Sequence, residues 1–197
     1  MKKLIIIITI FICSSMMAQR GKVATMAPIL SKGYYVNLRG DTVLGKIQIN
    51  PPNTTDFYEQ FFFQAKNAKK PKLFTAKNAK GYGFDDRHFV AADLNAKKLF
   101  IERLATGRLR FYELRVSEKA TNESEMETVY FIKDTQAETA DADLKKLKKI
   151  SPKFYKKILK PFMKDQPAIW DELDKYNFNE QNIISVVNQF NSYYSQK

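Results

Sequence analysis

Apolar and polar residues alternate in short runs through the first two thirds of the chain, a pattern typical of half-buried strands. The clearest runs are residues 34–38 and 42–49, which are rich in β-branched and aromatic residues. A tight hairpin turn is predicted between them, because Gly40 can adopt positive φ. A second hairpin turn is predicted at Gly107. Further strands are predicted at residues 57–64, 72–75, 87–92, 98–104, 109–116 and 128–133.

This succession of short strands predicts an antiparallel sheet, built as a sandwich or an open barrel. Residues 81–84, with the sequence Gly-Tyr-Gly-Phe, are predicted to form a turn with aromatic anchors. They lack the strand-to-helix context and the spacing of a phosphate-binding loop.

Helical periodicity replaces the alternation after residue 150. Ser151 is predicted to cap a helix that Pro152 begins. Pro161 is predicted to end or kink this helix, and Pro167 to open a second one. A third helix is predicted at about residues 179–194, where apolar residues again recur at helical spacing. The apolar face predicted for the first helix consists of Phe154, Tyr155, Ile158, Leu159 and Phe162.

These patterns predict an α+β chain in which a β-rich part precedes about three helices. We place the β-rich domain at residues 19–133 and the helical segment, packed on it, at residues 151–197. The stretch between them, 134–150, is predicted to be a linker that changes from acidic to basic. Its first ten residues are small, polar or acidic, without a large apolar side chain.

The N-terminus has the plan of a secretory signal peptide, predicted at residues 1–18. Two lysines precede the apolar run 4–12, and the small residue Ala18 follows it. That run is too short to span a bilayer, which needs about 20 residues, and no transmembrane segment is predicted in the mature chain. Cys13 raises the alternative of a lipoprotein, which the bulky Ile12 before it disfavours. We therefore predict export to the periplasm, the outer-membrane surface or the medium.

Charge and cysteine usage narrow the class of protein. The chain has a formal net charge of +12 and a single cysteine, Cys13, which the predicted cleavage removes. A domain without disulfides must be held by its own apolar core, which the aromatic content of 13% supports. The positive charge suits anionic partners, and it also suits a lysine-rich surface that serves only solubility.

Histidine chemistry is restricted to one residue, His88, which follows the carboxylates Asp85 and Asp86. This cluster has two interpretations, an acid-base or metal site and a polar turn that leads into a strand. We favour the turn, since Asp pairs are turn formers and Arg87 supplies a neutralising charge. No metal site and no cofactor are predicted.

Glu102 and Glu113 form the other carboxylate pair, because they fall on the two strands of the second predicted hairpin. A glycosidase needs two carboxylates about 5 to 10 Å apart across a cleft. The favoured interpretation is that both are exposed and paired with arginines across the hairpin.

Lysines are concentrated in the first predicted helix, where they lie opposite its apolar face. This basic face is predicted either to be solvated or to bind an anionic envelope surface or acidic glycan. Nucleic acid is a disfavoured partner, although residues 61–63, a Phe triplet, are followed by several lysines. The candidate binding residues are Lys153, Lys156, Lys157 and Lys160.

Several strand and turn motifs resemble a group of exported Bacteroidota proteins of uncharacterised function. The resemblance covers roughly residues 32–133 and implies export and a β-rich domain, and it supplies no catalytic residues to carry over. The motifs are Gly-Tyr-Tyr-Val at 33–36, Gly-Asp-Thr-Val-Leu-Gly-Lys-Ile at 40–47, Lys-Gly-Tyr-Gly-Phe at 80–84, Phe-Ile-Glu at 100–102, Gly107 and Phe-Tyr at 111–112.

From these observations we predict an exported, non-enzymatic protein that serves as a binding or structural component of the periplasm or cell surface. Two alternatives stay open. One is a hydrolase that uses carboxylates to act on an envelope or extracellular polymer. The other is an electrostatic binder of anionic envelope polymers.

Overall fold

The computed structural model describes residues 27–50, 56–94, 97–117, 126–135, 147–164, 166–175 and 177–195. The predicted signal peptide, its cleavage site at Ala18 and Cys13 lie outside the described residues, as does 136–146 of the predicted linker.

The described residues form ten strands and four helices. The strands are β1 (Leu30–Val36), β2 (Thr42–Gln48), β3 (Gln60–Ala65), β4 (Lys72–Thr75), β5 (Gly81–Phe84), β6 (Arg87–Leu94), β7 (Lys97–Ala105), β8 (Leu109–Ser117), β9 (Met126–Asp134) and β10 (Lys148–Ile150). The helices are α2 (Asp56–Glu59), α3 (Tyr155–Met163), α4 (Pro167–Lys175) and α5 (Glu180–Ser195).

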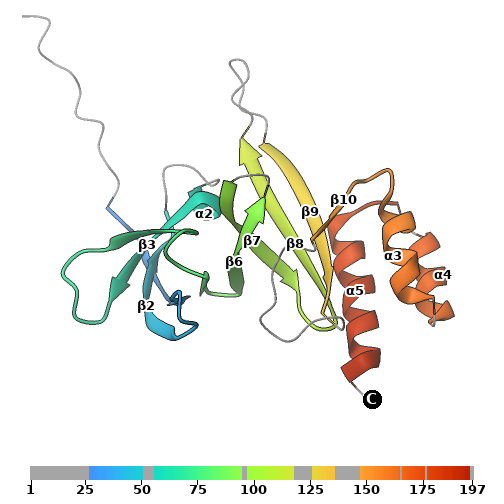
Figure 1. Cartoon of the computed structure of the whole chain (residues 1–197), viewed down its shortest axis with the longest axis horizontal. Helices are drawn as coiled ribbons and strands as arrows, with labels where there is room; N and C mark the ends of the chain where they lie inside the picture. The colour runs from blue at the N-terminus through green and yellow to red at the C-terminus, as the bar shows by residue number, and fades with distance from the viewer. Residues whose placement is uncertain are drawn as a thin grey trace, which may run out of the picture.

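All ten strands belong to one antiparallel sheet in the order β10-β9-β8-β7-β6-β5-β1-β2-β3-β4. The order departs from the chain order once, where β5 pairs with β1 and leaves β4 at an edge. The predicted class, an antiparallel β-rich part followed by about three helices, is confirmed. In Figure 1 the strands β2 and β3 lie at one end of the molecule and helices α3 to α5 at the other, with β6 to β9 between them.

The two predicted hairpin turns are confirmed, and each uses a glycine in the left-handed region. Gly40 has φ of 101° in the β1–β2 turn, and Gly107 has φ of 139° in the β7–β8 turn. The first turn is further held by the side chain of Asn37, whose Oδ1 accepts hydrogen bonds from the backbone N–H groups of Arg39 and Asp41 at 2.9 and 3.0 Å.

Strand β5 corrects the prediction of a turn at residues 81–84. All four residues are buried, and they pair with β1 on one side and β6 on the other. The glycines give one face no side chains, so the sequence shows no apolar-polar alternation. A Cβ at Gly83 would lie 2.8 Å from the Tyr34 ring, so the glycine allows that ring to cross the strand.

Two further segments differ from the predicted elements. Phe57 and Tyr58 begin the predicted strand 57–64, but they lie in α2 and are buried against the sheet. Residues 148–150 of the predicted linker form β10, which pairs with β9. In both cases packing between distant segments decides the local conformation, and the local sequence pattern does not reveal that packing.

One face of the sheet carries an aromatic core, to which α2 contributes. Tyr82 stacks on Phe61 with ring centroids 4.1 Å apart, and on Phe89 at 4.6 Å. Such offset ring pairs add stability beyond the area they bury. Other rings of this core are Tyr35, Phe57, Tyr58, Phe63, Phe74, Phe84 and Phe100.

The same face of β8 and β9 packs against the helices through a mainly aliphatic core. Phe111 stacks on Tyr130 at 5.5 Å, and the helices add apolar side chains that are almost wholly buried. Its buried members include Leu109, Ile132, Ile150, Leu159, Met163, Leu173, Ile183, Val186, Val187 and Phe190.

The start of α3 corrects the predicted cap at Ser151. The Ser151 carbonyl accepts a hydrogen bond from Phe154 N–H in a turn, and the helix begins at Tyr155. Phe154, predicted on the apolar face, is therefore 50% exposed. Pro161 lies inside α3, which ends at Met163. The predicted start of α4 at Pro167 is confirmed.

Helix α5 is capped and fixed to the sheet by two asparagines. Asn179 Oδ1 accepts from Gln181 N–H at 2.9 Å, which satisfies a free donor at the helix start. Asn191, buried near the other end, accepts from Leu109 N–H at 2.8 Å and donates to the carbonyls of Leu109 and Thr106 at 2.7 and 3.0 Å. These bonds hold the helix against the β7–β8 hairpin. Among the described residues, no helix is long and apolar enough to cross a membrane.

Candidate functional site

The two glutamates predicted as a candidate catalytic pair lie directly opposite each other on β7 and β8. Glu102 is the cross-strand partner of Glu113. Glu102 is only 7% exposed to solvent, and Glu113 only 1%. A bulge between Arg103 and Ala105 shifts the register and brings the two carboxylates into line. The prediction that they are exposed is wrong.

Each carboxylate has its own arginine, and a tyrosine connects the two. Arg87 binds Glu102 through two bonds, Nε to Oε1 at 2.8 Å and Nη2 to Oε2 at 2.5 Å. Arg115 Nε lies 3.0 Å from Glu113 Oε1. The Tyr58 hydroxyl donates to Glu113 Oε1 at 2.6 Å and lies 3.2 Å from Glu102 Oε2. We call these five residues, of which Tyr58 also belongs to the aromatic core, the carboxylate seam.

Burial affects the pKa of two residues of the carboxylate seam in the same direction. It raises the pKa of Glu113, and the neighbouring carboxylate of Glu102 adds to this rise, whereas Tyr58 and Arg115 oppose it. Burial also raises the pKa of the Tyr58 hydroxyl, and its hydrogen bond to Glu113 raises it further. Tyr58 is therefore a neutral donor at physiological pH.

Asp85, Asp86 and His88 do not join this pair. The two aspartates are exposed in the β5–β6 turn, as the turn interpretation predicts, and Asp85 accepts from Ser31 Oγ at 2.7 Å. His88 Nδ1 lies 2.8 Å from the Tyr34 hydroxyl. Because Phe89 is the partner of Glu102, the adjacent His88 points to the opposite face of the sheet.

The carboxylate seam is poorly suited to hydrolysis as it stands. A catalytic pair must reach a substrate in a cleft, and both carboxylates are buried and engaged by arginines. The described residues contain no group of three His, Cys, Asp or Glu that could hold a metal ion. The geometry supports a structural role, in which charged groups on β6, β7 and β8 are paired with one another and with Tyr58 of α2.

A second constellation lies on the other face of the sheet, in strands β1 to β4, which we call the hairpin lobe. Lys32 is the direct cross-strand partner of Lys46, and Lys46 is in turn the partner of Gln64. All three therefore share one face, opposite the aromatic core side chains Ile47 and Phe63. Lys32 and Lys46 are exposed, and β1 to β3 pair neither of them with an acidic residue. Asp85, which directly follows β5, is bound to Ser31, the neighbour of Lys32.

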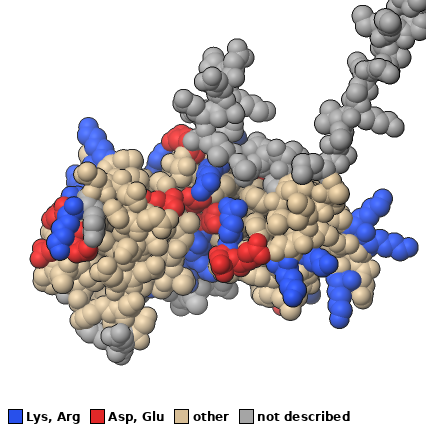
Figure 2. Space-filling view, turned by 180° about the vertical axis from the view of Figure 1, so that it is seen from behind, with Lys and Arg blue, Asp and Glu red and all other residues tan. Residues whose placement is uncertain are grey.

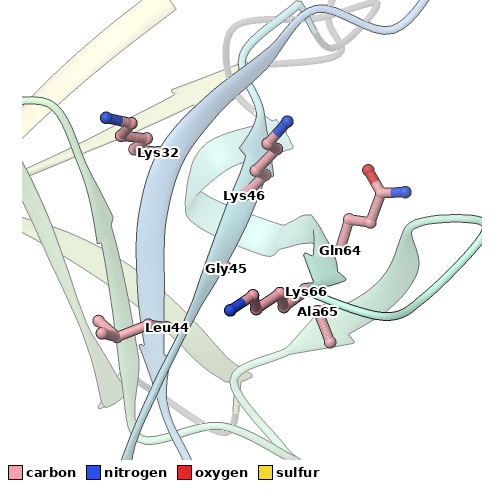
Figure 3. A pocket seen from close by; sticks show the side chains of 7 residues that line it. All are labelled: Lys32, Leu44, Gly45, Lys46, Gln64, Ala65 and Lys66. Carbon is pink, nitrogen blue, oxygen red and sulfur yellow. The ribbon is translucent and has the colours of Figure 1, made fainter.

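These residues surround a shallow groove of about 450 Å³. Figure 3 shows Lys32 and Lys46 on one side of Gly45, and Leu44 and Lys66 on the other. The volume is in the range of small-ligand sites, about 300 to 1,000 Å³. The groove is lined by Lys32, Leu44, Gly45, Lys46, Gln64, Ala65 and Lys66.

The charged residues on the β3–β4 side of the groove are all positive. Residues 60–80, which include β3 and β4, contain six lysines and no aspartate or glutamate. Figure 2 shows blue side chains projecting from the end of the molecule that carries the hairpin lobe, whereas red and blue are interleaved across the middle. The lining lysines, Lys32, Lys46 and Lys66, form no ion pair among the described residues.

The predicted binding lysines of the first helix are in a different electrostatic setting. Lys160 Nζ lies 2.7 Å from Asp174 Oδ2, and Lys156 donates to the Asp174 carbonyl at 3.1 Å. Lys160 also lies over the Trp170 ring, 4.9 Å from its centroid. The other two, Lys153 and Lys157, are exposed. Two of the four lysines thus hold α3 against α4.

Sequence reasoning missed the groove. The predicted three-residue turn at 39–41 would pair residue 38 with residue 42, and Lys32 with Gln48, whereas the observed register pairs Val36 with Thr42 and Lys32 with Lys46. Sequence reasoning also missed Tyr58, whose position depends on α2, and the pairing of Arg87 with Glu102, which lie on the paired strands β6 and β7.

The two phenylalanines that flank Phe62 lie in the aromatic core. This position removes Phe61 and Phe63 from the surface that base stacking would need.

Comparison of the chain with protein-family models, with curated proteins and with solved structures finds no significant match. The resemblance to exported Bacteroidota proteins stays a prediction.

Proposed function

We propose that the protein is an exported, non-enzymatic binding protein, and that the basic groove of the hairpin lobe holds an anionic ligand. The observation that carries the proposal is the unneutralised Lys32–Lys46 pair. Like charges directly opposite each other across two strands destabilise a sheet. A polyanion that runs along this face and meets both ammonium groups would offset that repulsion.

The chemistry of the groove favours a ligand with more than one negative group. Lys66 adds a third ammonium group, and the Gln64 side chain adds an amide next to Lys46. Lysine is a compact point charge on a flexible stem, whereas planar, bidentate recognition of one carboxylate generally uses arginine. The groove therefore suits attraction to a polyanion more than stereospecific recognition of a small acid.

The hydrolase alternative is not supported by the position of its candidate residues. Glu102 and Glu113 are buried and paired, His88 lies on the opposite face, and Asp85 is in a turn. We infer that the carboxylates stabilise the junction between the two cores and take no part in ligand chemistry.

A binding titration tests the proposal. Heparin oligosaccharide, used as a soluble polyanion, is titrated into the wild-type chain and into a Lys32→Gln/Lys46→Gln/Lys66→Gln variant. We expect the variant to lose affinity by about tenfold or more at low salt, with a shallower dependence of affinity on salt concentration.

The matched control removes the same charge from the helical side through Lys149→Gln, Lys157→Gln and Lys164→Gln, which are all exposed. This variant should bind nearly as the wild type does. Equal losses in the two variants would mean that net charge alone governs binding, and the groove proposal would be wrong.

A further inference from the structure

The hairpin lobe exposes apolar side chains as well as lysines. Five large apolar residues are markedly exposed in the described part of the chain, and four of them belong to or flank this lobe. The most exposed is Leu44, at 76%. The others are Ile29, Leu38 and Leu73 in the lobe and Phe154 before α3.

Two of these leucines share a face with the groove lysines. Leu44 and Lys46 are two residues apart in β2, so they point the same way. Gln64, the cross-strand partner of Lys46, points to the same face. Phe62 is two residues before Gln64 in β3 and therefore also points to this face, as does its partner in β4, Leu73. One continuous surface, which we call the outer face, therefore consists of Lys32, Leu44, Lys46, Phe62, Gln64 and Leu73.

We propose that the outer face docks on an anionic lipid bilayer. This inference rests on the proposed function and names its ligand as a membrane surface. The lysines would contact headgroup phosphates, while Leu44 and Leu73 enter the boundary between headgroups and acyl chains. Surfaces that combine exposed apolar side chains with lysines bind anionic membranes through burial of apolar area and through electrostatic attraction to the lipid headgroups.

The exposed leucines favour a bilayer over a soluble acidic polymer. A polymer of charged groups satisfies Lys32 and Lys46 but leaves Leu44 in water. A bilayer satisfies both, since lysine stems extend along the apolar boundary and keep their ammonium groups at the headgroups. The lack of acidic residues in 60–80 removes the repulsion that a negatively charged membrane would otherwise meet near this face.

Vesicle co-sedimentation with the full chain tests the inference. The probes are phosphatidylcholine vesicles with and without phosphatidylglycerol, and the variant is Leu44→Ser/Leu73→Ser. We expect wild-type protein to sediment only with the anionic vesicles, with high salt reducing the bound fraction. The leucine variant should bind them about tenfold more weakly, because two apolar side chains no longer leave water. Its affinity for heparin oligosaccharide should stay at the wild-type level.

The matched control is Leu38→Ser/Phe154→Ser, which removes two exposed apolar side chains outside the outer face. It should sediment as the wild type does. If the Leu44→Ser/Leu73→Ser variant binds anionic vesicles as strongly as wild type, the docking inference is overturned. If wild type binds heparin but no vesicle, the inference fails and the proposed function stands, with a soluble acidic polymer as ligand. If it binds neither, both fail.

Discussion

The hairpin lobe and the helical side of the sheet both carry many lysines, but the charges of the residues next to those lysines differ. On the helical side, Lys156 and Lys160 share Asp174, which holds α3 beside α4. In the hairpin lobe, Lys32 faces Lys46 across two strands. The number of lysines is therefore a poor guide to a binding surface, and the presence or absence of a nearby carboxylate is a better one.

The two regions also differ in how they use apolar side chains. The helices bury theirs in an aliphatic core, while the hairpin lobe buries aromatic rings on one face and exposes leucines on the other. The carboxylate seam shares Tyr58 with the aromatic core. This contrast is the basis of our proposal that the helical end and the seam form a scaffold and that the hairpin end binds the ligand.

Removal of Arg87 should have the largest effect on the scaffold. Its guanidinium binds Glu102 and lies 4.9 to 5.6 Å from the centroids of three aromatic rings. Arg87→Ala leaves Glu102 buried without its cation, so we expect the free energy of unfolding in urea to fall by about 3 kcal/mol. The control is Arg39→Ala, which breaks the exposed pair with Asp41 and should be silent. Equal stability of the two variants would show that the seam is not structural.

Removal of Asn191, which fixes α5 to the β7–β8 hairpin, should have the next largest effect on stability. Asn191→Ala leaves the backbone N–H and carbonyl of Leu109 without their side-chain partners. We expect a loss of about 2 kcal/mol in the free energy of unfolding, because buried polar groups then lack hydrogen bonds. The exposed Asn188 of the same helix provides the control Asn188→Ala. A wild-type value for Asn191→Ala would mean that apolar packing alone fixes the helix.

Glu113 should give the scaffold a dependence on pH. Burial raises its pKa in the folded state above the usual 4.5, so between these values the folded state binds more protons than the unfolded state. This contribution stabilises the fold at low pH and is lost as pH rises through the raised pKa. Glu113→Gln keeps an acceptor for Tyr58 and cannot titrate, so its stability should fall less over that range in urea unfolding at a series of pH values. Parallel profiles for the two proteins would contradict the assignment.

The smallest change in stability is expected in the hairpin lobe, where a substitution should stabilise the fold. Lys46→Gln removes the repulsion of Lys32, so the midpoint of thermal unfolding should rise by about 1 °C at low salt. The gain should disappear at high salt, where the charges are screened. A lower midpoint would show that Lys46 has a stabilising partner and would weaken the case for an unsatisfied site.

Turn chemistry explains how much of the fold the sequence predicts. Gly40 and Gly107 mark their hairpins because few other residues tolerate their backbone angles, and Pro167 marks the start of α4. Strand β5 was missed because Gly81 and Gly83 leave one face without side chains, so a buried strand resembles a turn.

The candidate site was harder to predict because it depends on which face of a strand is covered. Alternation places Glu102 and Glu113 on one side of a hairpin, but it does not reveal that α2 covers that side. The bulge in β7 then sets them opposite each other. For the lysines, the predicted turn gives a hairpin register that differs from the observed one by two residues. The pairing of Lys160 with Asp174 depends on how α3 packs on α4.

Lysine footprinting by mass spectrometry tests most directly whether the hairpin lobe is the binding surface. The wild-type chain is acetylated briefly with and without saturating heparin oligosaccharide, and the modification rate of each lysine is measured. We predict that Lys32, Lys46 and Lys66 become several-fold less reactive when the polyanion is bound, while Lys153 and Lys157 keep their rates. Protection of Lys153 and Lys157 with unchanged rates at Lys32 and Lys46 would contradict the account and place the binding surface on the helices.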